Sequence, residues 1–92
     1  MRIRYTTPAK QDLMAIQDYI AQDDPAAAHR LIQRIREQVE NLGRHSHLGR
    51  PGKIPGTREL SISGTPYFVV YRIKQRSIEM LSVVHARRKW PR

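Results

Sequence analysis

The chain has 92 residues, no cysteine and a formal net charge of +9. This length fits one domain with one modest core. The missing cysteines exclude a disulfide framework and a thiolate metal site, which suits a reducing cytoplasm. The first residues, MRIRYTTPAKQDL, lack the apolar region of a signal peptide, and no stretch has the ~20 apolar residues of a membrane span. We therefore expect a single cytoplasmic domain, 1–92, with no membrane association, metal or cofactor.

The positive charge is concentrated in the second half of the chain. Residues 1–43 carry six Lys or Arg and six Asp or Glu, which cancel. Residues 44–92 carry eleven Lys or Arg against two acidic residues, Glu59 and Glu79, and so hold the whole net charge. Such a local positive potential favours a polyanion or an acidic protein as the partner. The alternative is a basic surface that serves solubility alone.

A short strand and two helices are predicted first. Arg2 to Tyr5 alternates as a half-buried strand does. Thr7 before Pro8 predicts a helix with Thr7 as N-cap and Pro8 as its first residue, and Asp24 before Pro25 predicts a second helix that stops at Gly43. The short connection predicts an antiparallel hairpin. Helical spacing predicts buried stripes at Ala9, Leu13, Ile16 and Ile20, and at Ala28, Leu31 or Ile32, Ile35, Val39 and Leu42.

The second half is predicted to be mainly β. Residues 43–57 hold four Gly and two Pro and predict a long basic loop. Strands are expected at 57–63, 67–74 and 77–85, joined by tight turns into an antiparallel meander. The helical hairpin and the sheet must each bury one apolar face, so we expect them to cover one another. The predicted fold is α+β, in the order β-α-α-β-β-β, with both helices on one face of a small, mainly antiparallel sheet.

His85 is the strongest candidate for chemistry, because imidazole both accepts and donates protons near neutral pH. It precedes Arg87 and Arg88. Together with Lys53, Arg58 and Arg72 to balance phosphate charge, it would suit RNA cleavage by 2′-hydroxyl attack, whereas the alternative is a structural histidine at a strand end.

Other candidate residues also have two interpretations. Tyr67 or Tyr71 could be a second proton carrier, although their alternation favours a place in the core. His45 and His47 could bind a metal, but no acidic partners stand at ligand spacing, and loop histidines are favoured. Trp90 is either an anchor that packs back on the domain or a contact for a partner.

Three segments carry a resemblance to a known family. They are DLMAIQDYIAQDDPAAAHRLIQRI, PGTRELSISGTPYFVVYRI and VVHARRKWP. Together they cover most of the chain, and their order is part of the resemblance. The sequence resembles toxins of type II toxin–antitoxin modules in the RelE/ParE superfamily. The resemblance implies a growth-inhibiting toxin, of the kind associated with plasmid stabilisation, that is neutralised by a cognate antitoxin. It also implies that operator DNA is bound only indirectly, through the antitoxin, and this chain has no helix-turn-helix of its own.

The resemblance leaves two targets open. The HARRKWP ending and the DDPAAAHRL helix start are more similar to ParE-like members, which poison DNA gyrase without cutting nucleic acid themselves. The residues to contact that target would be Arg58, Arg72, His85, Arg87, Arg88, Lys89 and Trp90. RelE-like members are mRNA interferases that act on the ribosome. Their catalytic set can be carried over only to Lys53, Arg58, Arg72, His85 and Arg87, and the terminal Tyr of many such enzymes is missing, with Trp90 near its place.

Overall fold

The two helices begin at capping residues that precede a proline. The computed structural model describes residues 1–91. Helix α1 (Thr7–Ala21) has its N-cap one residue earlier than predicted: Thr6, not Thr7, accepts the Ala9 N–H, and Pro8 is the second helical residue. Proline is tolerated at either position, since neither N–H has a partner inside the helix. Helix α2 (Pro25–Asn41) begins as predicted, with the Asp24 carboxylate accepting the Ala27 N–H at 3.1 Å.

Five strands form one mixed sheet in the order β1-β5-β4-β3-β2. They are β1 (Arg2–Tyr5), β2 (Arg50–Pro51), β3 (Arg58–Ser61), β4 (Tyr67–Lys74) and β5 (Ser77–His85). Strand β1 is parallel to β5 and the other pairs are antiparallel, so the predicted meander is confirmed. Strand β3 is shorter than the predicted 57–63, and the loop of residues 43–57 contains β2, which was not predicted.

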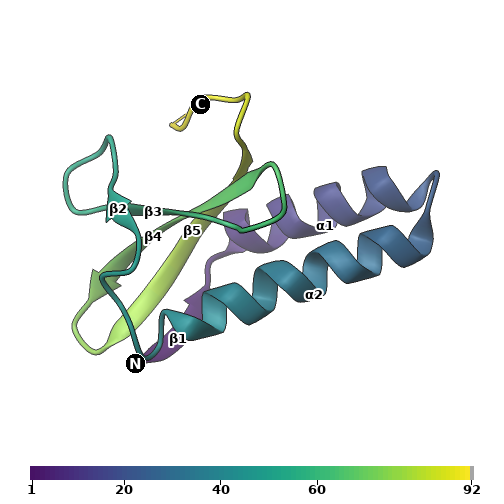
Figure 1. Cartoon of the computed structure of the whole chain (residues 1–92). Helices are drawn as coiled ribbons and strands as arrows, with labels where there is room; N and C mark the ends of the chain where they lie inside the picture. The colour runs from purple at the N-terminus through teal and green to yellow at the C-terminus, as the bar shows by residue number, and fades with distance from the viewer. Residues whose placement is uncertain (92) are drawn as a thin grey trace.

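The helical hairpin covers one face of the sheet, as predicted (Figure 1). The predicted stripes are in the core or at its margin, with Ile16, Ile20 and Leu31 half-buried. The connection between β3 and β4 is held to α2, because Gln38 Oε1 accepts the Ser63 N–H at 3.0 Å and Arg34 donates to the Ser63 carbonyl at 3.2 Å. The core combines residues of both layers: Ala9, Leu13, Ile32, Ile35, Val39, Leu42, Ile62, Val69, Tyr71, Ile78, Met80 and Val83.

Strand β5 contains a β-bulge that reverses its alternation. Val70 of β4 pairs with Ser82 and the next residue pairs with Met80, so Leu81 is the extra residue. The bulge lets both Met80 and Val83 face the core although their numbers differ in parity. Beyond the bulge β1 has ended, and the Asp12 carboxylate of α1 accepts the Val83 N–H at 2.9 Å and the Ser82 hydroxyl at 2.6 Å.

Candidate functional site

A cleft of about 550 Å³ opens between helix α1 and the end of the sheet where β5 finishes. Helix α1 contributes Tyr19, whose residue is 74% exposed, and the sheet contributes Tyr67 and His85. Arg88 reaches the same cleft from the C-terminal tail, so aromatic, acidic, imidazole and guanidinium groups share one space. The full lining is Asp12, Ala15, Ile16, Tyr19, Tyr67, Val83, Val84, His85 and Arg88.

His85 is held in this cleft by two contacts. Its ring packs edge-on against Tyr67, with centroids 5.3 Å apart and planes at 80°. Its Nδ1 accepts the Arg87 N–H at 3.1 Å, so the neutral imidazole carries its proton on Nε2. Burial raises the pKa of Tyr67, the neighbouring Tyr19 raises it further, and Arg88 opposes the shift. Tyr67 is therefore a neutral hydroxyl at physiological pH, able to donate a hydrogen bond.

The C-terminal tail, residues 86–91, folds back along the domain. The Ala86 N–H donates to the Pro66 carbonyl at 2.7 Å and the Arg88 N–H donates to the His85 carbonyl at 2.8 Å, which forms a turn directly after β5. Trp90 is half-buried and lines a second cleft, of about 260 Å³, with Pro8, Gln11, Asp12, Leu81 and Ser82. Trp90 thus lies against the domain, and its role as a contact for a partner stays a prediction. Arg87, Arg88 and Lys89 remain exposed.

Of the remaining predicted site residues, Arg58 and Arg72 lie elsewhere on the sheet and Lys53 lies in the loop between β2 and β3. Arg58 begins β3 and donates to the Gly49 carbonyl at 2.7 Å, while the Lys53 N–H donates to Glu59 at 3.4 Å. Arg72 lies five residues along β4 from the residue opposite His85, a distance of roughly 16 Å along a strand. The structure thus places Arg88 in the cleft of His85 and Trp90 in a separate cleft, and it does not bring Lys53, Arg58 or Arg72 to either.

The two tyrosines proposed as proton carriers have different surroundings. Tyr71 is fully buried, accepting the Gly49 N–H at 2.9 Å and donating to the Ser46 carbonyl at 2.8 Å, so it holds the loop that precedes β2. Burial raises its pKa, and Gly49 and Arg58 oppose the shift. Tyr67, by contrast, lies beside His85 in the cleft.

The sequence did not identify the helix side of the cleft. Asp12, Ile16 and Tyr19 lie on one face of α1 at spacings of four and three residues, next to the core stripe. The helical spacing of these residues indicates that they share a face of α1. It does not indicate that this face lies along the end of β5. Among residues 1–91, no three His, Asp or Glu side chains are placed to hold a metal ion, and no helix is both long and apolar enough to cross a bilayer.

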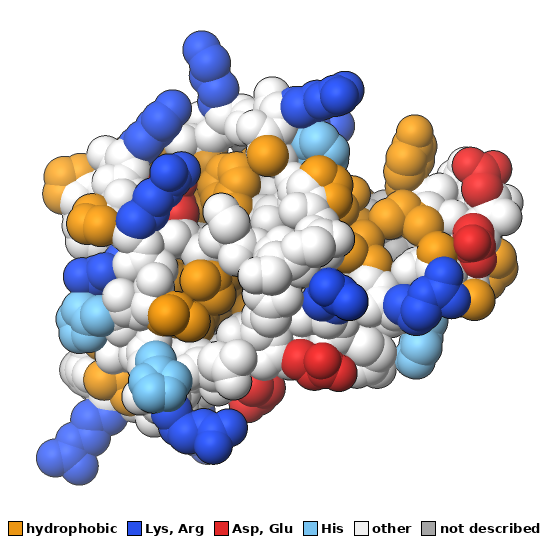
Figure 2. All heavy atoms as spheres, viewed as in Figure 1, with side chains coloured by type: hydrophobic (Ala, Val, Ile, Leu, Met, Phe, Trp, Pro, Cys, Tyr) orange, Lys and Arg blue, Asp and Glu red, His pale blue; other side chains and the backbone are white. Residues whose placement is uncertain are grey.

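Charge is unevenly distributed over the face drawn in Figure 2, although some Lys and Arg also lie on the helices beside Asp and Glu. In Figure 2 most Lys and Arg side chains lie over the sheet, its loops and the C-terminal tail, whereas Asp and Glu gather mainly around the helices. Basic side chains are therefore prominent on this face, as expected from the charge of the second half of the chain. The parallel pairing of β1 with β5 adds Arg2 and Arg4 to the cations of the sheet, although both belong to the electrically balanced first half.

A helical hairpin on one face of a five-stranded mixed sheet, with a basic tail after the last strand, defines the class of small RelE/ParE-type toxins. A family model described as "ParE toxin of type II toxin-antitoxin system, parDE" matches residues 3–90, and the chain belongs to this family.

Individual relatives agree with this assignment. The putative toxin Y4kP of Sinorhizobium fredii is 46% identical over 90 residues, covering 98% of this chain and 93% of the relative. A solved structure of the chromosomal ParDE toxin–antitoxin system from P. aeruginosa superimposes with a TM-score of 0.83 at 33% identity, covering 92% of this chain and 95% of that one. The RelBE2 toxin–antitoxin complex from Mycobacterium tuberculosis gives a TM-score of 0.67 at 27% identity, covering 91% and 95%.

Proposed function

We propose that this toxin acts in the cytoplasm by binding DNA gyrase and stabilising its cleaved DNA complex. The proposal is supported by the match of the ParE family model over residues 3–90 and by the likeness to a ParDE toxin. It agrees with the shape of the C-terminal end, which offers exposed cations beside an open aromatic cleft. Such a surface is suited to docking on a large partner.

The observation that carries the proposal is the separation of His85 from Lys53, Arg58 and Arg72, three cations of the RelE-like catalytic set. His85 lies at one end of β4 and β5, while Arg72 and Arg58 lie toward the other end of β4. A phosphoryl-transfer site needs its proton carrier and its charge-stabilising groups within about 3 Å of the reacting atoms. Docking needs no such convergence, so the arrangement favours binding over catalysis.

A cognate antitoxin is the second proposed partner, as in the ParDE and RelBE2 systems that this chain resembles. An amphipathic segment with apolar side chains in the cleft and acidic ones near Arg87, Arg88 and Lys89 would combine apolar burial with charge complementarity. We expect operator DNA to be reached only through that antitoxin. Co-expression with a neighbouring small gene should restore growth that the toxin alone arrests.

Ribosome-dependent mRNA cleavage is the alternative function. One observation favours it: His85, Tyr67, Asp12 and Arg88 share a single cleft. In that reaction His85 Nδ1, once released from the Arg87 N–H, would take the proton from the 2′-hydroxyl, the 2′-oxygen would attack phosphorus, and the P–O5′ bond would break to leave a cyclic phosphate and a 5′-hydroxyl. Tyr67 would be the donor to the leaving oxygen.

Parallel reactions with purified protein test the two functions. Gyrase poisoning predicts accumulation of cleaved DNA in a gyrase and plasmid reaction, with no cuts in mRNA during cell-free translation. His85→Ala should then keep most of the cleaved-DNA yield, whereas removal of residues 86–92 should reduce it at least tenfold. A Lys10→Gln/Arg30→Gln variant is the control, because it removes two cations from the helices. Codon-specific mRNA cuts that disappear in His85→Ala would instead support the interferase.

A further inference from the structure

One part of the basic surface lies on the sheet at the end far from His85. The β1–β5 and β4–β5 registers place Arg4, Glu79 and Arg72 in one row across three strands, with Arg2, Ser77 and Lys74 in the next. Arg76 is in the turn between β4 and β5. We call the five cations the β1–β4 patch: Arg2, Arg4, Arg72, Lys74 and Arg76.

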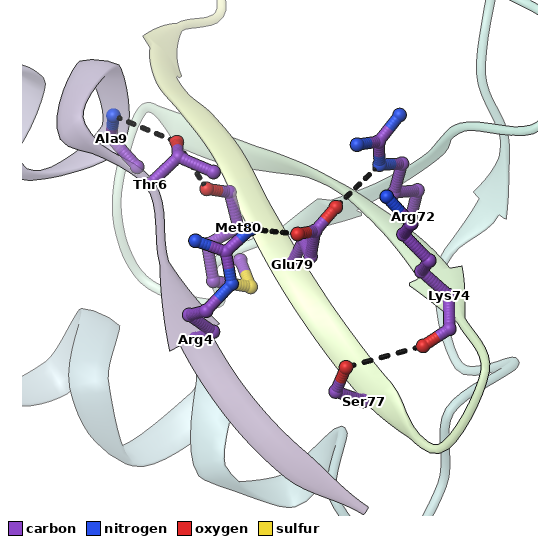
Figure 3. Close-up of polar contacts among 8 residues, drawn as sticks. All are labelled: Arg4, Thr6, Ala9, Arg72, Lys74, Ser77, Glu79 and Met80. Carbon is purple, nitrogen blue, oxygen red and sulfur yellow. Dashed lines mark hydrogen bonds and ion pairs between the residues drawn. The ribbon is translucent and has the colours of Figure 1, made fainter.

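Glu79 fixes two of these cations. Its Oε1 accepts from Arg72 Nε at 2.6 Å and its Oε2 accepts from Arg4 Nη2 (Figure 3). The Glu79 side chain is only 5% exposed, whereas those of Arg4 and Arg72 are 57% and 46% exposed. A guanidinium has five N–H donors, so each arginine retains donors for a ligand after its contact with Glu79. The carboxylate therefore holds two guanidinium groups on neighbouring sites at the surface.

The contacts of Glu79 with Arg4 and Arg72 contribute more to ligand recognition than to the stability of the fold. A buried carboxylate pays a desolvation cost that offsets most of its attraction to the arginines. However, because Glu79 already holds the arginines in one geometry, they lose less side-chain entropy on binding than flexible side chains do. With five cations around Glu79, the patch retains a net charge of +4.

The ligand chemistry follows from what the patch contains and lacks. The guanidinium fork matches phosphate oxygens, and a row of cations on a strand face matches a chain of repeated charges. Protein interfaces need an apolar centre. The four clefts described for residues 1–91 are lined by none of the five cations. Of the strongly exposed apolar side chains, Met14, Tyr19, Leu48 and Ile54 belong to α1 or the loop around β2, and only Met1 lies next to a residue of the patch.

We propose that the β1–β4 patch binds the sugar–phosphate backbone of a nucleic acid, with Arg4 and Arg72 as the oriented phosphate contacts. Lys74, Arg76 and Arg2 supply further attraction around them. This site is separate from the His85 cleft and does not depend on gyrase being the target. It gives the toxin a direct contact with the DNA or RNA on which its target works.

Fluorescence anisotropy with a labelled mixed-sequence DNA duplex and a labelled single-stranded RNA tests the proposal without gyrase, ribosome or antitoxin. Each lost phosphate contact lowers the slope of log K against log salt by about 0.9 for duplex and about 0.7 for a single strand. Arg4→Gln/Arg72→Gln should therefore lower it by about 1.8 on duplex DNA, with affinity at ~0.1 M salt falling roughly 60-fold. The nucleic acid that the wild-type protein binds more tightly at the same salt concentration identifies the ligand.

Two further variants keep the test independent of folding. Lys74→Gln/Arg76→Gln removes two exposed patch cations without touching Glu79 and should also weaken binding, by about tenfold or more. Lys10→Gln/Arg30→Gln removes the same charge from the helices and should change affinity less than about threefold. Equal losses in patch and helix variants would overturn the proposal, as would wild-type protein that binds neither nucleic acid. Loss of antitoxin affinity with nucleic-acid binding intact would assign the patch to an acidic protein and overturn it too.

Discussion

The contact of Asp12 with β5 gives the sharpest prediction about stability. Its carboxylate closes the strand edge past the end of β1 by accepting the buried Ser82 hydroxyl and the Val83 N–H. Hydrogen bonds to a charged acceptor contribute about 1.5 to 3 kcal/mol, and each buried donor left unpaired costs about 1 to 3 kcal/mol. Asp12→Ala should therefore lower the free energy of unfolding by about 3 kcal/mol.

Thermal unfolding followed by circular dichroism measures this effect. For a domain of this size, 1 kcal/mol corresponds to about 4 to 8 °C, so Asp12→Ala should lower Tm by about 12 to 24 °C. Asp12→Asn keeps one acceptor oxygen and should lie between. Asp18→Ala, which removes an exposed carboxylate from the same helix, should shift Tm by less than about 4 °C. If Asp12→Ala and Asp18→Ala had the same Tm, the Asp12 carboxylate would not be closing this edge of β5.

Three other predictions concern tyrosines and a turn, each checked by urea midpoints. Tyr71→Phe should lower the free energy of unfolding by about 1.5 to 3 kcal/mol, because it leaves the buried Gly49 N–H without its acceptor. Tyr5→Phe should leave the free energy of unfolding unchanged or raise it slightly, because the Tyr5 hydroxyl has no hydrogen-bond partner among the described residues. Burial raises the pKa of Tyr67 and Tyr71 in the folded protein. The stability that depends on their neutral forms is therefore complete below the unfolded-state pKa of about 10 and is lost as the pH rises above it. This loss of stability with pH should be less steep in Tyr71→Phe. Gln75→Gly should gain about 0.5 to 1 kcal/mol, since Gln75 has a φ of 56° in the β4–β5 turn.

Each of these has a contrary outcome. Equal midpoints for Tyr71→Phe and Tyr5→Phe would mean that the hydroxyl partners do not matter. A midpoint unchanged between pH 9 and pH 11 (both about one unit from the ordinary value of 10) would remove the tyrosines from the alkaline transition. A destabilised Gln75→Gly would show that the turn needs the glutamine side chain.

Much of the fold follows from local signals in the sequence. Proline after a capping residue marks both helix starts, and Asp24 was placed correctly, whereas Thr6 and Thr7 were confused because adjacent threonines offer the same hydroxyl. Strands β4 and β5 have the predicted bounds because their β-branched runs end at turn residues. The parallel β1–β5 pair and the two-residue β2 were not predicted, since both depend on contacts between distant segments.

The candidate site was less accessible to sequence reasoning. His85 and the tail could be singled out because they adjoin one another in the chain. Tyr19 could not be singled out, since nothing in the local sequence indicates which end of the sheet α1 crosses. Arg4 was counted with the electrically balanced half of the chain, because its ion pair with Glu79 spans 75 residues. The folding of the sheet, more than the composition of any segment, decides which charges act together.

The place of β5 has a consequence for synthesis of the toxin. This strand is the last to emerge from the ribosome, yet it lies between β1 and β4 and joins the two ends of the chain. A polypeptide abandoned before residue 77 leaves β1 without its neighbour and both halves of the basic face disconnected. Translation interrupted at that point therefore yields fragments without the assembled sheet surface.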